Sequence, residues 1–256
     1  MTKAPDVGVS IDGHVATVTL KRPPHNFVDA KFLTAIAESL EALDGEAACR
    51  AVVLASEGKS FCAGADLSGG LGGGEPFDMA GFYGEAMRLF RTRKPIIAAV
   101  QGPAVGAGVG LALIADFRIG CPASRFSVNF NRLGFHPGFG LSFTLQRLIG
   151  RQQAALLFYT GRRINGEAAH AIGLVDELVP DGEVLQRAQA LAAEIAISAP
   201  QAVMSTRAAL RDGLADEVKA WNARELEMQR QQFQTRDFLE GLAAAGERRA
   251  PNFTGS

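Results

Sequence analysis

The stretch from Val100 to Phe117 reads VQGPAVGAGVGLALIADF, and it continues the apolar run IIAAV (Ile96–Val100). Glycines at positions 102, 106, 108 and 110 lie among small apolar residues, with no charged side chain or nucleophile between Gln101 and Asp116. IIAAV predicts a buried strand, and the apolar residues from Gly108 to Ala115 predict a helix. Such a glycine-rich turn cradles a phosphate, allows close packing, or presents backbone groups for chemistry.

The spacing of these glycines argues against a nucleotide phosphate. A dinucleotide fingerprint needs G-x-x-G after its second glycine and an acidic residue about 20 positions later. Here the spacing is GAGVG, and Asp116 follows too early. A P-loop is excluded because no GK[ST] follows. Taken alone, the stretch favours packing, since small residues let a helix lie close to a strand or loop.

A second turn of the same kind changes this interpretation. FCAGADL (Phe61–Leu67) also follows an apolar strand-like run, AVVLAS (Ala51–Ser56), and also consists of small residues. Each turn can offer one backbone N–H with no side chain in the way. Two such donors that converge on one carbonyl oxygen form an oxyanion hole.

Strands and helices alternate over the first two thirds of the chain, and helices complete it. This order predicts an α/β fold with a C-terminal helical region. Alternation or apolar runs predict strands at 14–20, 51–56, 96–100, 117–120 and 125–128, and a short extended piece at 174–180. Helical periodicity predicts helices at 27–43, 77–91, 108–115, 141–149, 152–159 and 165–171, and from 185 almost to the end with breaks at Pro200 and Gly213.

The composition excludes several classes of protein. The 256 residues carry a formal net charge of −1, and the basic residues are scattered, which argues against nucleic acid as a partner. No segment resembles a secretory signal or approaches the roughly 18 apolar residues of a membrane span. The three cysteines are odd in number and widely spaced, so we expect reduced thiols in the cytoplasm. No Cys/His cluster has metal-ligand spacing, and we expect no metal.

Several segments together resemble the enoyl-CoA hydratase/isomerase (crotonase) superfamily. The resemblance covers nearly the whole chain, and its pieces occur in the family's order. They are RPPHN (22–26), FCAGADL (61–67), KPIIAAVQGPAVGAGVGLALIADFRI (94–119), LGFHPGFGLSFTLQRLIG (133–150), GRRINGEAAHAIGLVDELVP (161–180) and FQTRDFLEGLAAAGERRAPNF (233–253).

The resemblance implies a crotonase-type spiral of ββα units over residues 1–200 and a C-terminal helical trimerisation region over residues 201–256. It implies an acyl-CoA thioester as substrate, with coenzyme A as part of the substrate and no separate cofactor. It also implies a homotrimer or a dimer of trimers. The oxyanion-hole N–H groups would belong to Ala65 and Ala107.

The resemblance further implies contacts with the coenzyme. Asp66 is expected to cap the following turn in preference to acting as a base, and the alternative for Arg248 is a solvated helix end. His25 lies beside the early turn and would contact the nucleotide. The implied coenzyme contacts are Arg22, Asn26, Ala63, Asp66, Leu67 and Arg248.

The acidic residues of the family are missing. The resemblance places the two hydratase glutamates at Gly110 and Phe130, and the isomerase acid at Gly138. One well-placed acid or base contributes about 10²–10⁴ in rate, so another group must substitute for them. His136 is the expected candidate, because it lies in the isomerase loop and imidazole transfers protons near neutral pH.

Other groups stay open as substitutes. The amides at Asn129 and Asn131 can hold water or a carbonyl but cannot act as bases, and a bound anion such as bicarbonate is a further option. Tyr83 and Glu85 lie on the helix after the glycine-rich loop, where we expect an exposed face, with a border of the acyl pocket as the alternative.

The sequence therefore predicts an acyl-CoA enzyme of the hydratase/isomerase type that stabilises a thioester enolate. The alternatives are an acyl-CoA-binding homologue with little turnover, and a CoA-thioester decarboxylase or hydrolase on the same scaffold. The acyl group, the exact reaction and the choice between trimer and hexamer are not determined at this level.

Overall fold

Over the described part of the chain, the main sheet has six strands. A computed structural model describes residues 6–66 and 78–256. The strand order is β1-β2-β3-β4-β6-β9; β1 is antiparallel to β2, and the other neighbours are parallel. The strands are β1 (Val7–Asp12), β2 (Val15–Leu20), β3 (Ala51–Ser56), β4 (Ile96–Val100), β6 (Phe117–Gly120) and β9 (Glu177–Leu178).

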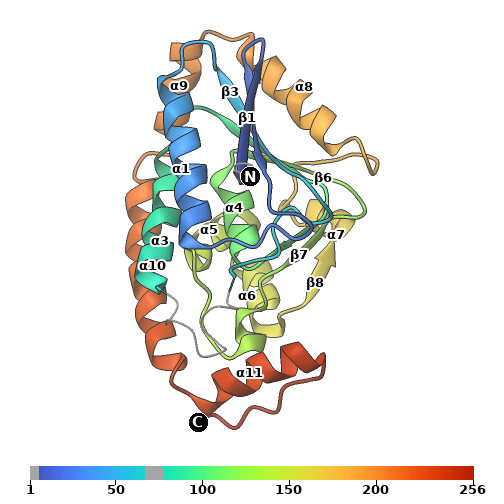
Figure 1. Cartoon of the computed structure of the whole chain (residues 1–256), viewed down its shortest axis with the longest axis vertical. Helices are drawn as coiled ribbons and strands as arrows, with labels where there is room; N and C mark the ends of the chain where they lie inside the picture. The colour runs from blue at the N-terminus through green and yellow to red at the C-terminus, as the bar shows by residue number, and fades with distance from the viewer. Residues whose placement is uncertain (1–5, 67–77) are drawn as a thin grey trace, which may run out of the picture.

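Helices cover both faces of this sheet, which explains the continuous apolar runs in its central strands. In β3, Val52 and Leu54 belong to the larger core with α1 (Ala30–Gly45), whereas Val53 and Ala55 face α8 (Val184–Ala196). Figure 1 shows α1 and α8 on opposite sides of the sheet. Alternate side chains of a strand point to opposite faces, so each face needs its own apolar set.

Helix α1 begins later than the sequence suggests because of its cap. The carboxylate of Asp29 accepts a hydrogen bond from the Phe32 N–H, which starts the helix at Ala30 instead of Phe27. The expected helix over 77–91 is α3 (Met79–Arg88), which continues into the 3₁₀ turn η1 (Leu89–Arg91). Its expected first residue, Phe77, lies outside the described residues.

A second, three-stranded sheet connects the glycine-rich stretch to the middle of the chain. Its order is β5-β7-β8, with β5 parallel to β7 and β7 antiparallel to β8. Its strands are β5 (Pro103–Val105), β7 (Arg125–Ser127) and β8 (Arg163–Asn165). The sequence did not predict β5 or β8, since three residues are too few for a periodic pattern, and it also missed the edge strand β1.

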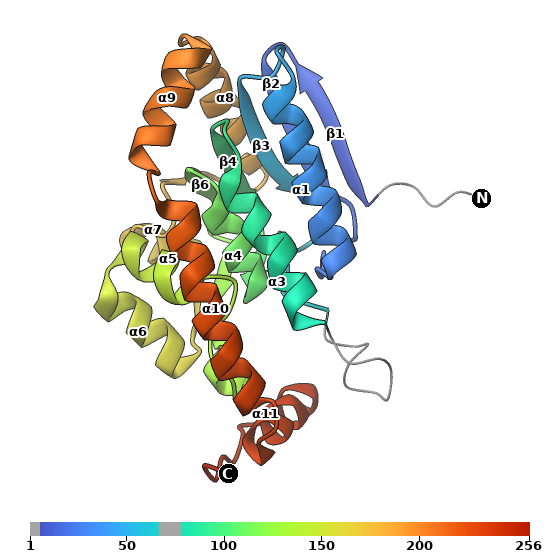
Figure 2. The ribbon, with the colours of Figure 1, turned by 90° about the vertical axis from the view of Figure 1, so that its left-hand side faces the viewer.

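Helices complete the chain, as expected. Figure 2 shows α10 (Leu214–Gln232) running down the molecule from α9 (Pro200–Leu210) to α11 (Arg236–Glu247). Helix α10 packs against α3 and α5 (Leu141–Ile149), and α11 packs against the 3₁₀ turn η2 (Asn129–Leu133). No helix in the described residues is long and apolar enough to cross a membrane. The remaining elements are α4 (Ala107–Ile114), α6 (Arg151–Thr160) and α7 (Gly166–Ala171).

Candidate active site

The two small-residue turns lie side by side. Cys62 and Ala104 form a parallel bridge, in which the Cys62 N–H donates to the Pro103 carbonyl at 3.1 Å and the Val105 N–H donates to the Cys62 carbonyl at 3.0 Å. Because both segments leave this bridge in the same direction, Ala65 and Ala107, each three residues further on, emerge at the same end.

The glycines of the opening stretch make this approach possible. A Cβ at Gly108 would lie 2.0 Å from the Cys62 carbonyl oxygen, a separation that no side chain tolerates. Gly106, the residue before α4, has φ +53°, in the left-handed region that favours glycine. The glycines therefore serve close packing, and the result of that packing is that the first turn of α4 lies against the segment at Cys62.

The amides of Ala65 and Ala107 are free of main-chain partners in the described residues. Ala65 is bridged to Val28 through its neighbours, since the Val28 N–H donates to Gly64 and the Asp66 N–H donates to Val28. Peptide groups alternate in direction along an extended segment, so the Ala65 N–H points away from Val28. Ala107 is the first residue of α4, where an N–H has no intrahelical acceptor.

Both alanines line one cavity of about 160 Å³. The backbone of the two turns forms one part of its wall, and aromatic side chains form most of the rest. Apart from Tyr83, no ionisable side chain among the described residues lines it. The wall consists of Ala63, Gly64, Ala65, Met79, Phe82, Tyr83, Val105, Gly106, Ala107, Asn129, Phe130, Leu133, Phe135, Phe139 and Phe233.

Aromatic groups fill the space next to the glycines at the expected acid positions. A Cβ at Gly110 would lie 2.4 Å from Cδ1 of Phe139, and a Cβ at Gly138 would lie 1.9 Å from the Tyr83 hydroxyl oxygen. Phe130, at the other expected position, lines the cavity itself. A carboxylate at position 110 or 138 would therefore require Phe139 or Tyr83 to move.

Tyr83 is buried, so the expectation of an exposed helix face is wrong for this residue. Its hydroxyl donates to Oε1 of Gln229 on α10 at 3.0 Å. Burial raises the pKa of Tyr83 well above its ordinary value, which keeps the hydroxyl neutral. Glu85 is half-buried and forms an ion pair with Arg88.

His136 lies elsewhere. It lines a separate depression with Asn131, Gln232 and Asp237, and it is not among the residues around the cavity. Its Nδ1 donates to the carbonyl oxygen of Pro137 at 2.7 Å, and its backbone N–H donates to Oε1 of Gln232. The structure therefore does not bring His136 together with Ala65 and Ala107, whereas Asn129 does line the cavity.

Of the expected coenzyme contacts, Ala63 lines the cavity, Asp66 follows it in the same turn, and Leu67 lies outside the described residues. Arg22 pairs with Asp6 and Asp29 at 2.6 and 2.8 Å, near the start of α1.

Asn26 is fully buried, and its Nδ2 donates to the carbonyl oxygens of Glu57 and Ser60. Arg248 is exposed and ends α11 in the left-handed conformation. Asn26 therefore holds the early turn together, and neither of these residues lines the cavity.

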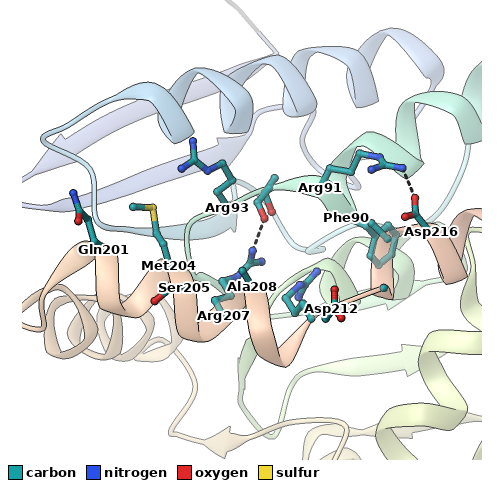
Figure 3. A pocket seen from close by; sticks show the side chains of 14 residues that line it. Phe90, Arg91, Arg93, Gln201, Met204, Ser205, Arg207, Ala208, Asp212 and Asp216 are labelled. Carbon is teal, nitrogen blue, oxygen red and sulfur yellow. Dashed lines mark hydrogen bonds and ion pairs between the residues drawn. The ribbon is translucent and has the colours of Figure 1, made fainter.

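A larger hollow of about 650 Å³ lies between α9, the start of α10 and the turn at 90–93 (Figure 3). Its walls carry Arg207, which pairs with Asp116 at 2.8 Å, and Arg91, which pairs with Asp216 at 2.7 Å (the latter drawn in Figure 3). The hollow shares no lining residue with the aromatic cavity and contains neither of the two turns. The aromatic cavity is therefore the candidate active site, although it is the smaller of the two.

Aromatic residues from three separate parts of the chain were not anticipated. Phe82, Phe135, Phe139 and Phe233 line the cavity but have no chemistry that marks them in a sequence. Helical periodicity around Phe82 identified only an apolar face.

Comparisons with known proteins identify the family of the chain. A model of the enoyl-CoA hydratase/isomerase family matches residues 10–256. The protein named "Probable enoyl-CoA hydratase EchA14" of Mycobacterium tuberculosis is 37% identical over 260 residues, which cover 97% of this chain and 100% of that protein.

Solved structures are similar over the same extent. An enoyl-CoA hydratase/isomerase from Pseudoalteromonas atlantica has a TM-score of 0.89 at 28% identity, covering 98% of this chain and 100% of that one. A carnitinyl-CoA hydratase from Mycobacterium avium has a TM-score of 0.87 at 31% identity, covering 99% and 100%.

The α/β architecture, shared with these solved structures over nearly the whole chain, places the protein in the crotonase fold class. The chain belongs to the enoyl-CoA hydratase/isomerase family of acyl-CoA enzymes.

Proposed function

We propose that the protein binds an acyl-CoA thioester and stabilises its enolate with the backbone N–H groups of Ala65 and Ala107. The observation that carries this proposal is that both residues, from turns 42 positions apart in sequence, line one apolar cavity. Fixed donors aimed at an oxygen that gains negative charge stabilise the transition state, and the apolar surroundings strengthen them. The first turn of α4 adds the positive end of a helix dipole.

The chemistry follows from this placement. When a base removes the proton at the α-carbon, the C–H electron pair moves toward the thioester carbonyl, and the oxygen becomes anionic. Hydration also passes through a thioester enolate: water loses a proton to a base and adds to the β-carbon of an enoyl thioester, and the electron pair moves to the thioester oxygen. In either case the α-carbon then takes a proton. The neutral hydroxyl of Tyr83 cannot serve as the base, because its raised pKa opposes ionisation.

Hydrogen exchange with solvent tests the proposal directly. The purified protein would be incubated with butyryl-CoA and crotonyl-CoA in D₂O and the thioesters analysed by mass spectrometry. We expect deuterium at the α-carbon, with or without hydration. The proton-transfer proposal fails if no thioester in a broad panel gains deuterium or changes in any other way.

The variant Ala107→Pro removes one proposed donor with little disturbance of the helix. Ala107 is the first residue of α4, a position where proline is tolerated because its missing N–H has no helical partner. We expect a loss of about 10²–10³ in turnover. Ala30→Pro is the matched control, since Ala30 is the first residue of α1 and lies outside the cavity. Equal activity of the two variants would exclude Ala107 as a donor.

A second candidate is acyl-CoA binding with little turnover. It is supported by the cavity wall, which has no carboxylate or imidazole among the described residues. It predicts measurable binding with only background conversion. Replacing His136 by alanine should leave both properties unchanged if the imidazole acts only in its own depression. A large loss of turnover with retained binding would instead identify the His136 imidazole as the base.

Decarboxylation or thioester hydrolysis remains a third candidate. Loss of CO₂ from a 2-carboxyacyl thioester forms the same enolate with no proton to remove, which suits a wall without a base. Release of CO₂ from malonyl-CoA, or of free thiol, would identify these reactions in the same incubations.

The assembly is part of the proposal. A homotrimer or a dimer of trimers, formed through residues 201–256, would cover the apolar side chains that this region exposes, such as Leu210 and Leu239 at 74% and 63% exposure. Light scattering of the purified protein would test it, and a monomer at micromolar concentration would contradict it.

A further inference from the structure

The Phe139 ring, which forms part of the cavity wall, packs against further aromatic rings. Phe139 contacts Phe82 and Phe90 with ring centroids 6.3 and 6.4 Å apart, in edge-to-face arrangements. Phe139 and Phe90 are 1% and 3% exposed. Outward movement of the Phe139 ring would therefore displace a second buried layer, which a close-packed interior resists.

The conformation of Phe139 is also held by hydrogen bonds. Phe139 has φ +66°, an uncommon value for a residue with a large side chain. The next residue, Gly140, donates its N–H to the buried carboxylate of Glu225 at 2.7 Å, and Glu225 also accepts from the Ser142 N–H. Glu225 thereby fixes the backbone that directs the Phe139 ring over Gly110.

Tyr83 forms another fixed part of the wall. Its hydroxyl is bonded to Gln229, which is fully buried and whose Nε2 donates to the carbonyl oxygen of His136. The ring is thus anchored at its outer end, and it contacts Phe82 with centroids 5.3 Å apart.

The volume sets the size of what fits. The cavity measures about 160 Å³ and includes the part next to Ala65 and Ala107 that would hold the thioester. For scale, an apolar protein cavity of about 150 Å³ holds one benzene molecule. Rigid aromatic walls around such a volume favour a compact apolar group over a long flexible chain.

We propose that this cavity selects a compact acyl group no larger than about a benzene ring, and that Phe139 sets the limit. Straight chains of eight or more carbons are excluded. This inference rests on the proposed function, because it assumes that the cavity holds the acyl part of a CoA thioester. It concerns the described walls alone.

Binding of a graded series tests the limit. Calorimetric dissociation constants would be measured for free CoA and for butyryl-, benzoyl- and octanoyl-CoA. In a pocket without an end, each additional buried methylene strengthens binding about fourfold, so octanoyl-CoA would bind roughly two hundredfold more tightly than butyryl-CoA. We expect octanoyl-CoA to bind at least tenfold more weakly than both butyryl- and benzoyl-CoA.

A pair of matched variants assigns the limit to one ring. Phe139→Leu shortens a ring that lines the cavity, whereas Phe158→Leu makes the same change at a buried ring of α6 that does not line it. We expect Phe139→Leu to improve octanoyl-CoA binding at least tenfold relative to butyryl-CoA, with no change of this ratio in Phe158→Leu. If Phe139→Leu fails to fold, the wild-type series alone decides the size limit.

The outcomes separate the two proposals. Equal or tighter binding of octanoyl-CoA overturns the size limit and leaves the proposed function intact. Absence of binding by every thioester overturns the proposed function and this inference with it. An unchanged ratio in Phe139→Leu, or the same change in both variants, overturns the role of Phe139.

Discussion

Asp116 should be among the most destabilising positions to mutate outside the apolar core. Its carboxylate accepts hydrogen bonds from the Ile96 N–H and the Arg207 Nε at 2.8 Å each, and from the Arg211 Nη1 at 3.2 Å. The side chains of Arg207 and Arg211 are only 7% and 14% exposed. One carboxylate thus compensates two buried guanidinium groups, whose Nη2 atoms have no partner in the described residues.

Replacing Asp116 by alanine leaves both charges buried and uncompensated. Removing one partner from a buried ion pair costs about 3–5 kcal/mol. The Ile96 N–H also loses its acceptor, which costs about 1–3 kcal/mol. Since a typical domain is stable by about 5–15 kcal/mol, Asp116→Ala should remove a large part of the free energy of unfolding. Asp116→Asn keeps an acceptor and should cost less.

Urea unfolding followed by circular dichroism measures this cost, at one protein concentration for all variants so that association affects them equally. Asp216→Ala is the control, because Asp216 pairs with Arg91 at 2.7 Å while the two side chains are 79% and 55% exposed. That exposed pair should contribute no more than about 1 kcal/mol. The reasoning is refuted if Asp116→Ala costs as little as the control.

Three further changes test other parts of the structure. Gly108→Ala places a Cβ 2.0 Å from the Cys62 carbonyl oxygen, so it should lower stability by about 1–3 kcal/mol and weaken acyl-CoA binding. The control Gly84→Ala has open space in α3 and should stabilise by about 0.5–1 kcal/mol; similar effects of both would contradict the packing argument. Burial raises the pKa of Cys62 to about 12, so it should resist a disulfide reagent at pH 8 until the protein unfolds. Because this pKa lies above the ordinary 9.0, stability should fall as pH rises from about 9 toward 12, and a reactive Cys62 in the folded protein would be inconsistent with its burial. The hydrogen bond from Arg249 lowers the pKa of Glu240 to about 2. The Glu240 carboxylate, which also accepts from the Asn252 N–H, should therefore hold the C-terminal segment in place above about pH 4.5 and release it as pH falls toward 2. Protection factors for amide hydrogen exchange in residues 249–256, taken relative to the intrinsic rates at each pH, should fall over that pH range, and in Glu240→Gln already at pH 6; unchanged protection in the variant would show that the contact is unimportant.

The local elements were largely predictable. IIAAV and AVVLAS form β4 and β3 with the expected bounds, because a strand covered on both faces must be apolar at every position. The helix over 141–149 also has its expected bounds. Short strands escaped prediction because β5 and β8 gain their hydrogen bonds from the partner β7, which local sequence does not specify.

The site was predictable only in its backbone part. Glycine and alanine in two turns after strands indicated amides that a ligand can approach, and those turns do line one cavity. The position of His136 was not predictable, because its place in the loop does not determine on which side of Phe135 the imidazole lies. The burial of Tyr83 depends on Gln229, which is 146 residues away in sequence.

Sequence by itself determined where the chain turns, which strands are buried and which turns expose their amides, because these follow from interactions between near neighbours and from side-chain size. Tertiary structure alone decided what surrounds those amides. Phe139 covers Gly110, and Tyr83 fills the space beside Gly138, because helices and loops distant in sequence pack there. The shape of a cavity is the space that such packing leaves, and no single segment encodes it.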